Sequence, residues 1–233
     1  MSDAGAVVVI GGTRAIGLEI ARHYAKAGRE VVLTGRSQEN VDTAVAELGA
    51  GVTGLAFDLA DPSTIGPALA GVGRVDRLAI VAIDRDHNSI RDYDAARATR
   101  LAVLKLVGYA EVVHALLDRL GPESSILLFG GQARFAPYPG STTVTTVNGG
   151  VEGLTRALVF ELKPIRVNCL HPGIVGDSPY WENKQAALDA ARARTPTGKL
   201  ATMADIVGSA VFLLESPAIN GIELRVDGGF HST

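Results

Sequence analysis

The stretch AVVVIGGTRAIG, residues 6–17, decides the fold of this chain. Its first half is an aliphatic run typical of a buried strand, and its second half is a glycine-rich turn that opens a helix. Glycines at such a turn let the backbone approach a pyrophosphate, whose charge is met by amide groups at the helix N-terminus. A second apolar strand at residues 31–34 completes the βαβ order of a dinucleotide-binding unit. We therefore expect a dinucleotide to contact Gly11, Thr13, Arg14, Ile16 and Gly17.

Short apolar runs recur along the chain between longer patterns with helical spacing. They lie at Ala6–Ile10, Glu30–Thr34, Thr53–Phe57, Arg77–Ala82, Ser125–Phe129, Ile165–Leu170 and Ile222–Val226. Such alternation predicts an α/β fold, a doubly wound Rossmann-like domain whose parallel sheet has helices on both faces. No linker or repeat divides residues 1–233, so we expect one domain. Residues 177–202 are more polar and predict either a substrate lid or a solvated surface helix.

Composition excludes several classes of protein. The 233 residues carry a net charge of −3, so there is no basic field to attract nucleic acid. A single cysteine, Cys169, excludes an internal disulfide and fits a reducing compartment, for which the cytoplasm is the expectation. The N-terminus lacks the pattern of a signal peptide, and no apolar run is long enough for a membrane span. We also find no ligand-like histidine spacing for a metal.

The residues after the second strand select the cofactor. Gly35-Arg36-Ser37 stands where an NAD site usually carries an acidic residue for the ribose 2′-hydroxyl. The Arg36 guanidinium suits a 2′-phosphate instead, so we expect NADP(H). Arg14 is either a second contact to that phosphate or a solvated loop residue.

With these features the chain resembles the short-chain dehydrogenase/reductase family from Val7 to Gly229. Ile10, Gly11, Ala15 and Gly17 stand opposite the fixed positions of the family's T-G-x-x-x-G-x-G motif. The resemblance implies an adenine contact at Asp58 and Leu59 and a nicotinamide contact around Pro172, Gly173 and Val175. It implies that Asp177-Ser178 stands where a threonine often contacts the cofactor amide. It also implies a homo-oligomer, a tetramer or a dimer, formed through the long helices and the C-terminal segment.

The family's four catalytic positions carry other residues here. The resemblance implies a tyrosine, a lysine, a serine and an asparagine, which serve general acid–base catalysis. The corresponding positions hold Val144, Asn148, Gly131 and Lys105. Valine carries no exchangeable proton and asparagine no charge, so we expect a rebuilt catalytic site.

Three residues are candidates to replace the lost groups. Lys105 lies on an apolar helix stripe. Its charge has one of three functional explanations there: contact with the cofactor, pairing with a carboxylate, or action as a base. The alternative is snorkelling, in which the apolar stem lies on the stripe and the ammonium extends to solvent. Tyr138 lies on a Pro-Gly stretch before the helix, and His87 lies in the charged loop after the fourth strand. His171 adjoins the expected nicotinamide contact. Two functions remain open: an NADP(H)-dependent oxidoreductase acting on a small-molecule substrate, and an NADP(H)-binding sensor or structural partner without turnover.

Overall fold

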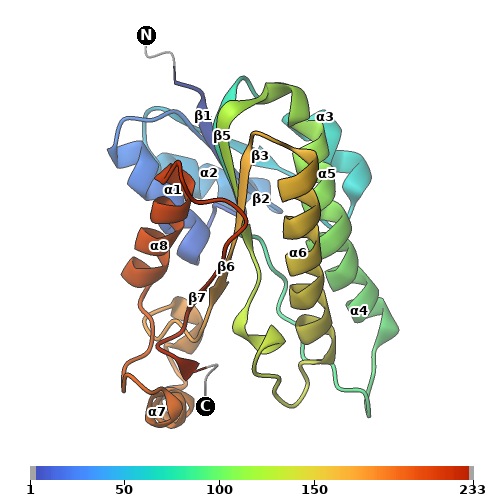
Figure 1. The fold of residues 1–233 in the computed structure, drawn as a ribbon, viewed down its shortest axis with the longest axis vertical. Coiled ribbons are helices and arrows are strands. Elements are labelled where there is room, and N and C mark those ends of the chain that lie inside the picture. Colours follow the sequence, from blue (N-terminus) through green and yellow to red (C-terminus); the bar gives the residue numbers. More distant parts are fainter. Residues whose placement is uncertain (1–3, 231–233) are drawn as a thin grey trace.

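The computed structural model describes residues 4–230 and contains a seven-stranded parallel sheet in the order β3-β2-β1-β4-β5-β6-β7 (Figure 1). The strands are β1 (Ala6–Ile10), β2 (Val31–Gly35), β3 (Val52–Ala56), β4 (Val75–Ile80), β5 (Leu120–Phe129), β6 (Arg166–Pro172) and β7 (Glu223–Val226). The predicted doubly wound α/β fold is confirmed, and each predicted strand is present. Strand β5 begins five residues earlier than expected, because Leu120 pairs with Val75 across a register shift.

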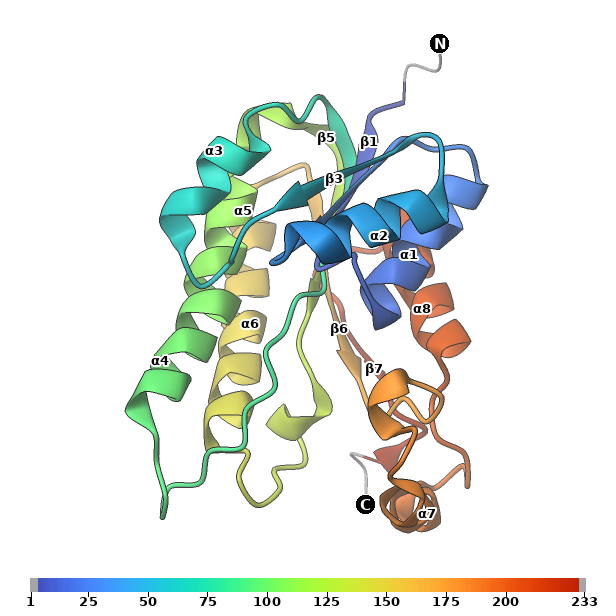
Figure 2. The same ribbon diagram turned by 180° about the vertical axis from the view of Figure 1, so that it is seen from behind.

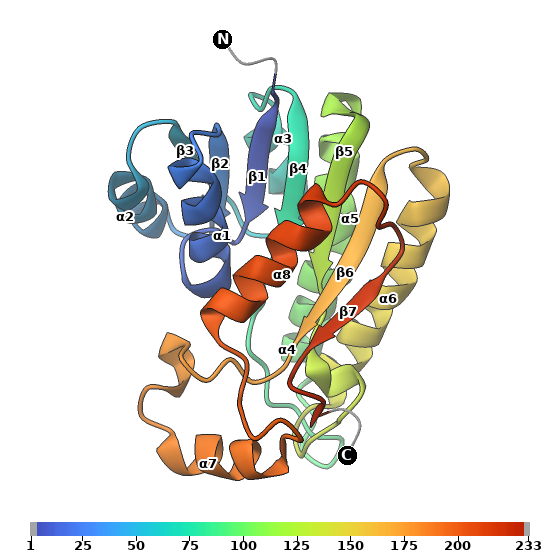
Figure 3. The same ribbon diagram turned by 60° about the vertical axis from the view of Figure 1, so that its left-hand side comes forward.

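Helices cover both faces of the sheet (Figures 2 and 3). One face carries α1 (Ala15–Lys26), α2 (Gln38–Leu48) and α8 (Met203–Glu215), and the other carries α3 (Ile65–Leu69), α5 (Tyr109–Ala115) and α6 (Thr142–Glu161). Helix α4 (Ala95–Ala102) runs beside α6, and α7 (Gln185–Arg194) lies beyond the carboxyl ends of the strands. Short helical turns occupy Pro62–Thr64, Leu117–Arg119, Gln132–Arg134 and Pro179–Trp181. No helix within residues 4–230 combines the length and apolar character of a membrane span.

Strand β1 shows why the apolar runs form the centre of the sheet. Val7 and Val9 pack into the core under α1 and α8, whereas Val8 and Ile10 pack into the core under α3, α5 and α6. All four side chains are buried, and each contributes about 1.5–3 kcal/mol to folding. A strand buried on both faces needs a continuous apolar run, which is the pattern in the sequence.

The strand order reverses between β1 and β4, which places a crevice at their carboxyl ends. In open α/β sheets ligands bind at this point. Three segments surround it: the glycine turn after β1, residues 81–94 after β4, and residues 173–202 after β6. The last segment contains the predicted lid.

The long helix expected from Leu101 to Leu120 contains an irregular turn. Helix α4 passes into a π-helical turn, η2 (Val103–Gly108), before α5 continues the same run. Such turns are rare and occur frequently at functional sites. This one places Lys105 on the buried side and sets Gly108 against Leu59, whose carbonyl oxygen would overlap a Cβ at Gly108. Glycine therefore permits the close packing of this helix on the loop after β3.

Candidate active site

The glycine turn brings the N-terminus of α1 to the end of β1. Gly11 has a φ of +86°, and a Cβ there would lie 2.8 Å from backbone atoms of Ala82. A Cβ at Gly17 would overlap the carbonyl oxygen of Gly11. Thr13 packs over the end of β2, where a Cβ on Gly35 would lie 2.6 Å from its Cγ2. The first amide groups of α1, which lack partners within a helix, are thus placed to hold an anion such as a pyrophosphate.

Ala15 is the one non-glycine residue within residues 4–230 that has a positive φ, +48°. It occupies the position of the family's middle glycine. A left-handed conformation costs an L-residue about 1–2 kcal/mol because Cβ crowds the carbonyl oxygen. Strain of this kind at a ligand-binding turn is held in place by the surrounding structure, here β1 and α1. The Ile16 side chain packs against the core beside it.

An ion-pair chain connects the loops around the expected adenosine site. Arg36 contacts Asp84 at 2.9 Å, and Arg100 contacts both Asp84 at 3.2 Å and Asp58 at 2.8 Å. Burial alone would raise the pKa of Asp58, but hydrogen bonds from the Ala60 amide and from Arg100 outweigh it and lower that pKa. Arg36 is therefore already paired with a carboxylate.

Two further residues of the predicted adenosine site differ in how they are held. Arg14 is exposed, and within residues 4–230 it has no carboxylate partner. The Leu59 side chain is buried in the core, so only its backbone can meet a ligand. Of the two predicted phosphate-binding arginines, Arg14 is thus the unpaired one.

The segment after β6 lies beside the end of β7. The Gly173 amide donates to the Val226 carbonyl at 2.9 Å, and a Cβ at Gly173 would lie 2.6 Å from the Cβ of Asp227. Val175 is buried and bridges to Ala201. Asp177 Oδ1 accepts from the Met203 amide at 2.7 Å, so its carboxylate holds the start of α8. The cofactor contact expected at Asp177 thus competes with a structural hydrogen bond.

Three buried polar atoms near this edge have no hydrogen-bond partner among residues 4–230: Gln132 Nε2, Thr143 Oγ1 and Asn148 Oδ1. A Cβ on Gly131 would lie 2.7 Å from Asn148 Nδ2, so the ends of β5 and α6 meet here. Gln132 Oε1 would lie 3.3 Å from a Cβ on Gly173, which connects these residues to the segment after β6. Because buried polar groups normally find partners, these atoms fit a polar ligand such as a nicotinamide ribose or its amide.

Lys105 is 1 % exposed, so its ammonium does not reach solvent. The snorkelling interpretation is therefore wrong. Its Nζ donates to the Phe129 carbonyl at the end of β5, and Tyr109 Oη donates to the Ala82 carbonyl at 2.8 Å. Burial lowers the pKa of Lys105 to about 8. The lysine thus contacts the end of β5, at Phe129, two residues before Gly131.

His171 is held as a neutral base inside the core. Its Nδ1 accepts from the Gly131 amide at 3.1 Å, and its Nε2 lies 3.6 Å from Glu223. Burial lowers the pKa of His171 to about 4. Cys169 Sγ lies 3.4 Å from the same Nε2, and burial raises the pKa of that thiol to about 12.

His87 and Tyr138 lie on two loops that pack together. The Asn88 amide donates to the Gly140 carbonyl at 2.7 Å, and the His87 ring fills the space that a Cβ on Gly140 would occupy. His87 is exposed, which supports its interpretation as a solvated loop residue. Tyr138 is 50 % exposed, and burial raises the pKa of its phenol.

The sequence interpretation missed Arg85, which lies in the same charged loop as His87. The Arg85 guanidinium stands 3.2 Å from the ring centroid of Tyr180, a residue of the predicted lid. The sequence does contain a signal for Arg85, since a charged loop follows a strand at the ligand-binding edge. That pattern does not distinguish Arg85 from His87.

The sequence and the structure were compared with those of known proteins. Residues 11–231 match the family model described as enoyl-(acyl carrier protein) reductase. A 3-oxoacyl-[acyl-carrier-protein] reductase from Bos taurus is 30% identical over 97% of each chain. The solved MalC reductase/Diels-Alderase from Malbranchea aurantiaca superposes with a TM-score of 0.90 at 25% identity, covering 98% of this chain and 96% of that one. A protein named inactive 2-(S)-hydroxypropyl-CoM dehydrogenase 2, from Xanthobacter autotrophicus, is 29% identical over 90% of this chain and 98% of its own. With its sheet order, its glycine turn and these full-length similarities, the chain belongs to the short-chain dehydrogenase/reductase family.

Proposed function

We propose that this protein binds NADP(H) at the carboxyl edge of the sheet and acts as an oxidoreductase with a rebuilt catalytic centre. The observation that carries the proposal is the glycine turn, where a Cβ at Gly17 would collide with the Gly11 carbonyl and a Cβ at Gly11 would collide with the backbone of Ala82 after β4. This close approach leaves the amide groups of α1 available for a pyrophosphate. The partnerless polar atoms of Gln132 and Asn148 support the other end of the same site.

The preference for NADP(H) rests on Arg14 and Arg36. Gly35-Arg36-Ser37 stands at the end of β2, and none of these three residues is an acid that would select a ribose 2′-hydroxyl. A 2′-phosphate carries more negative charge than the Asp84 carboxylate and would compete with it for Arg36. Arg14, which is exposed and unpaired within residues 4–230, adds a second contact.

In catalysis, bound NADP(H) supplies the hydride, and this chain's residues orient the substrate and provide the proton. Val144 and Asn148 cannot serve as the family's tyrosine and lysine, since neither titrates. We assign the proton to the Tyr138 phenol, whose raised pKa keeps it protonated at neutral pH. Lys105 holds the end of β5 through the Phe129 carbonyl and places a positive charge beneath the site. The segment 177–202 serves as the lid.

The second candidate function is NADP(H) binding without turnover. One specific observation favours it: of the groups facing each other at the ends of β5 and α6, Gly131 and Asn148 carry no titratable side chain. A relative that is 29% identical carries the word inactive in its name, which supports a loss of turnover here. The two candidates share the cofactor site and differ only in catalysis.

A fluorescence titration with NADPH and NADH tests the proposed cofactor. NADPH should bind more tightly, and Arg36→Ala should narrow the difference by about 1.5–3 kcal/mol, the worth of a charge-assisted hydrogen bond. Asp84→Asn, which releases Arg36, should strengthen NADPH binding by up to about fivefold and leave NADH unchanged. Lys26→Ala, at the far end of α1, controls for net charge. Equal affinities for the two cofactors would refute the NADP(H) assignment.

Turnover is measured separately. NADPH oxidation with a panel of carbonyl compounds, and NADP⁺ reduction with the matching alcohols, should show activity that Tyr138→Phe removes. The same variant should keep its NADPH affinity. Activity that survives Tyr138→Phe would exclude this phenol as the proton donor.

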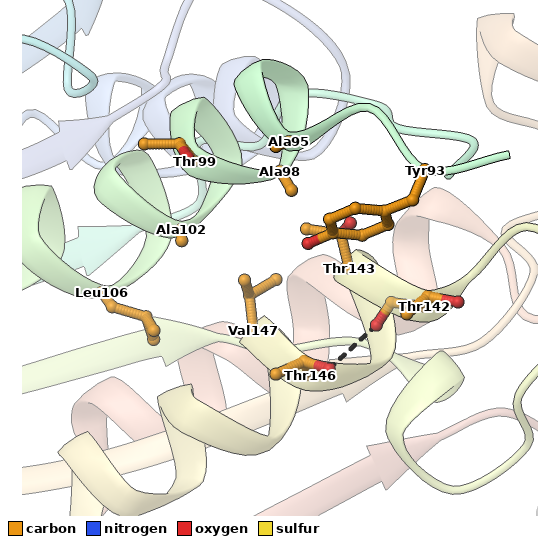
Figure 4. Close-up of a pocket in the computed structure, with 10 residues that line it drawn as sticks. All are labelled: Tyr93, Ala95, Ala98, Thr99, Ala102, Leu106, Thr142, Thr143, Thr146 and Val147. Atoms are coloured by element: carbon orange, nitrogen blue, oxygen red, sulfur yellow. Dashed lines mark hydrogen bonds between the residues drawn. The ribbon is translucent and has the colours of Figure 1, made fainter. Parts of the chain in front are cut away.

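We also propose that the protein is a homo-oligomer, a dimer or a tetramer. A groove of about 270 Å³ runs between α4 and α6, lined mainly by small and apolar side chains such as Ala98, Thr99 and Ala102 (Figure 4). Val107, Leu117 and Phe160 are exposed on the same layer of helices. Exposed apolar patches of this kind mark association surfaces. A second copy packed along α4 and α6 would cover them.

A further inference from the structure

Two cations share one aromatic ring beside the carboxyl edge of the sheet. The Arg85 guanidinium carbon lies 3.2 Å from the Tyr180 ring centroid, and Lys184 Nζ lies 3.3 Å from the same centroid. Two groups cannot stand this close over one face of a ring, so Tyr180 is held between them. Lys184 Nζ also lies 5.6 Å from the centroid of Trp181.

This cluster joins three separate segments of the chain. Arg85 comes from the loop after β4, while Tyr180 and Lys184 come from the segment between β6 and α7. Tyr138, from the loop before α6, interacts electrostatically with both Arg85 and Tyr180. We call Arg85, Tyr138, Tyr180 and Lys184 the entrance cluster. Because each segment lies at the carboxyl edge of the sheet, the cluster stands where a substrate enters.

Neither cation of the entrance cluster is paired with a carboxylate. Within residues 4–230 neither Arg85 nor Lys184 has an ion pair with an acidic side chain. The acids that flank Arg85 in sequence contact other arginines: Asp84 contacts Arg36 and Arg100, and Asp86, whose charge also acts on Tyr138, lies 3.6 Å from Arg97. Arg85 and Lys184 thus remain available to a negatively charged ligand.

The surroundings of Arg85 disfavour its charged form in the absence of a ligand. Burial lowers the pKa of Arg85; the phenols of Tyr180 and Tyr138 oppose this, and Arg14 adds to it. The hydrogen bond from Lys184, followed by the charge of Arg85, lowers the pKa of Tyr180. Cation–π contacts compensate by about 0.5–2 kcal/mol each. An anion placed among these groups would be favoured by both charges and by the phenol donors.

We propose that the entrance cluster binds a carboxylate or phosphate group of the substrate and so selects anionic carbonyl compounds. The guanidinium of Arg85 offers a planar fork that matches either oxyanion, and Lys184 offers a point charge. Arg85 and Lys184 are both exposed, so an oxyanion can reach the two cations from solvent. This inference rests on the proposed oxidoreductase function, because it assigns the substrate class of that site.

Trp181 provides a direct test, since it is the single tryptophan of the chain and adjoins Tyr180. Its fluorescence is titrated with two matched pairs: acetoacetate against ethyl acetoacetate, and dihydroxyacetone phosphate against dihydroxyacetone. The anionic member should bind about tenfold or more tightly in at least one pair, the worth of a charge-assisted contact. The pair that responds distinguishes a carboxylate from a phosphate substrate.

Substitutions of Arg85 test whether the entrance cluster causes the preference for the anionic ligand. Arg85→Gln should weaken binding of the anion about tenfold or more, and Arg85→Lys should restore part of it. Arg192→Gln on α7, where the arginine pairs with Asp189, removes the same charge from the same segment and should change binding by less than about twofold. Equal binding of the charged and neutral members, or an unchanged anion affinity in Arg85→Gln, would overturn the inference.

NADPH titrations of the same variants separate the two proposals. NADPH binding without anion selectivity would refute only the entrance cluster. Arg85-dependent anion binding without NADPH binding would refute only the cofactor proposal. If Arg85→Gln weakens the binding of NADPH but leaves the binding of acetoacetate and dihydroxyacetone phosphate unchanged, the cluster belongs to the cofactor site and the inference is wrong.

Discussion

Replacing Lys105 by methionine separates the energetic cost of the buried charge from its function. The substitution keeps most of the stem and removes the ammonium, which is 1 % exposed and donates to the Phe129 carbonyl. No carboxylate within residues 4–230 forms an ion pair with it. The folded chain therefore carries an isolated buried cation at neutral pH.

The expected change in the free energy of unfolding follows from the pKa of Lys105. Burial lowers this pKa from 10.5 to about 8, and at about 1.36 kcal/mol per pH unit the folded state loses about 3 kcal/mol by holding the proton. Losing the hydrogen bond to Phe129 costs about 1–2 kcal/mol. Lys105→Met should therefore raise the free energy of unfolding at pH 7 by about 1–2 kcal/mol. For a chain of this length that is about 2–8 °C in melting temperature.

The pH dependence gives the sharper measurement. In the unfolded chain Lys105 keeps its proton up to about pH 10.5, whereas in the folded protein it loses the proton near pH 8. At this site the unfolded state thus binds more protons between these values, and the contribution of Lys105 to the stability of the wild type rises through this window. Lys105→Met lacks this rise, so its advantage at pH 7 should disappear by about pH 9.5. Denaturant unfolding followed by circular dichroism at pH 7, 8 and 9.5 measures the difference.

The buried tyrosines do not confuse this comparison, because both proteins contain them. Tyr109 has a raised pKa owing to burial, and its effect on stability cancels in the difference between variant and wild type. A difference in stability that stays constant from pH 7 to 9.5 would refute the buried-cation argument. A parallel NADPH titration decides the functional part: weaker binding by Lys105→Met places the ammonium in the cofactor site, and unchanged affinity removes it from there.

Two further predictions concern the turn and the assembly. Ala15→Gly should raise the free energy of unfolding by about 1 kcal/mol, because the left-handed backbone at φ +48° no longer crowds a Cβ; thermal melting checks this, and destabilisation would show that Ala15 is unstrained. Light scattering at micromolar concentration should give the mass of a dimer or a tetramer. Thr99→Glu, in the groove between α4 and α6, should reduce this mass, whereas Thr43→Glu on α2 should leave it unchanged. A monomeric wild type would refute the oligomer.

Much of the fold could be predicted because it depends on local patterns. Each strand of a doubly wound sheet is buried on both faces, so it must be a short apolar run, and the runs were visible. The start of β5 could not be predicted, because residues 120–124 include glycine, proline and glutamate. Their place in the strand depends on pairing with Val75 of β4. The π-helical turn at η2 was also hidden, since one additional residue per turn leaves little trace in helical spacing.

The candidate site was less predictable because its contacts join distant segments. Gly11, Gly17 and Arg36 could be selected from the βαβ pattern alone. The ion pair of Arg36 with Asp84 depends on how the loops after β2 and β4 meet, and the contact of Arg85 with Tyr180 joins residues far apart in sequence. No periodicity encodes such contacts. Tertiary packing alone decides which charged loop residue becomes part of the site.

The residues after β5 form one packed unit with Asn148 of α6 and His171 of β6. The His171 ring fills the space beside Gly130, and the Asn148 amide fills the space beside Gly131, where a Cβ would lie 2.7 Å from Nδ2. The Gly131 amide in turn donates to His171 Nδ1 at 3.1 Å. A side chain at position 131 would therefore require the Asn148 amide to move. Because the contacts are mutual, a substitution at Gly131, Asn148 or His171 would disturb the other two, so the three positions have to be tested together.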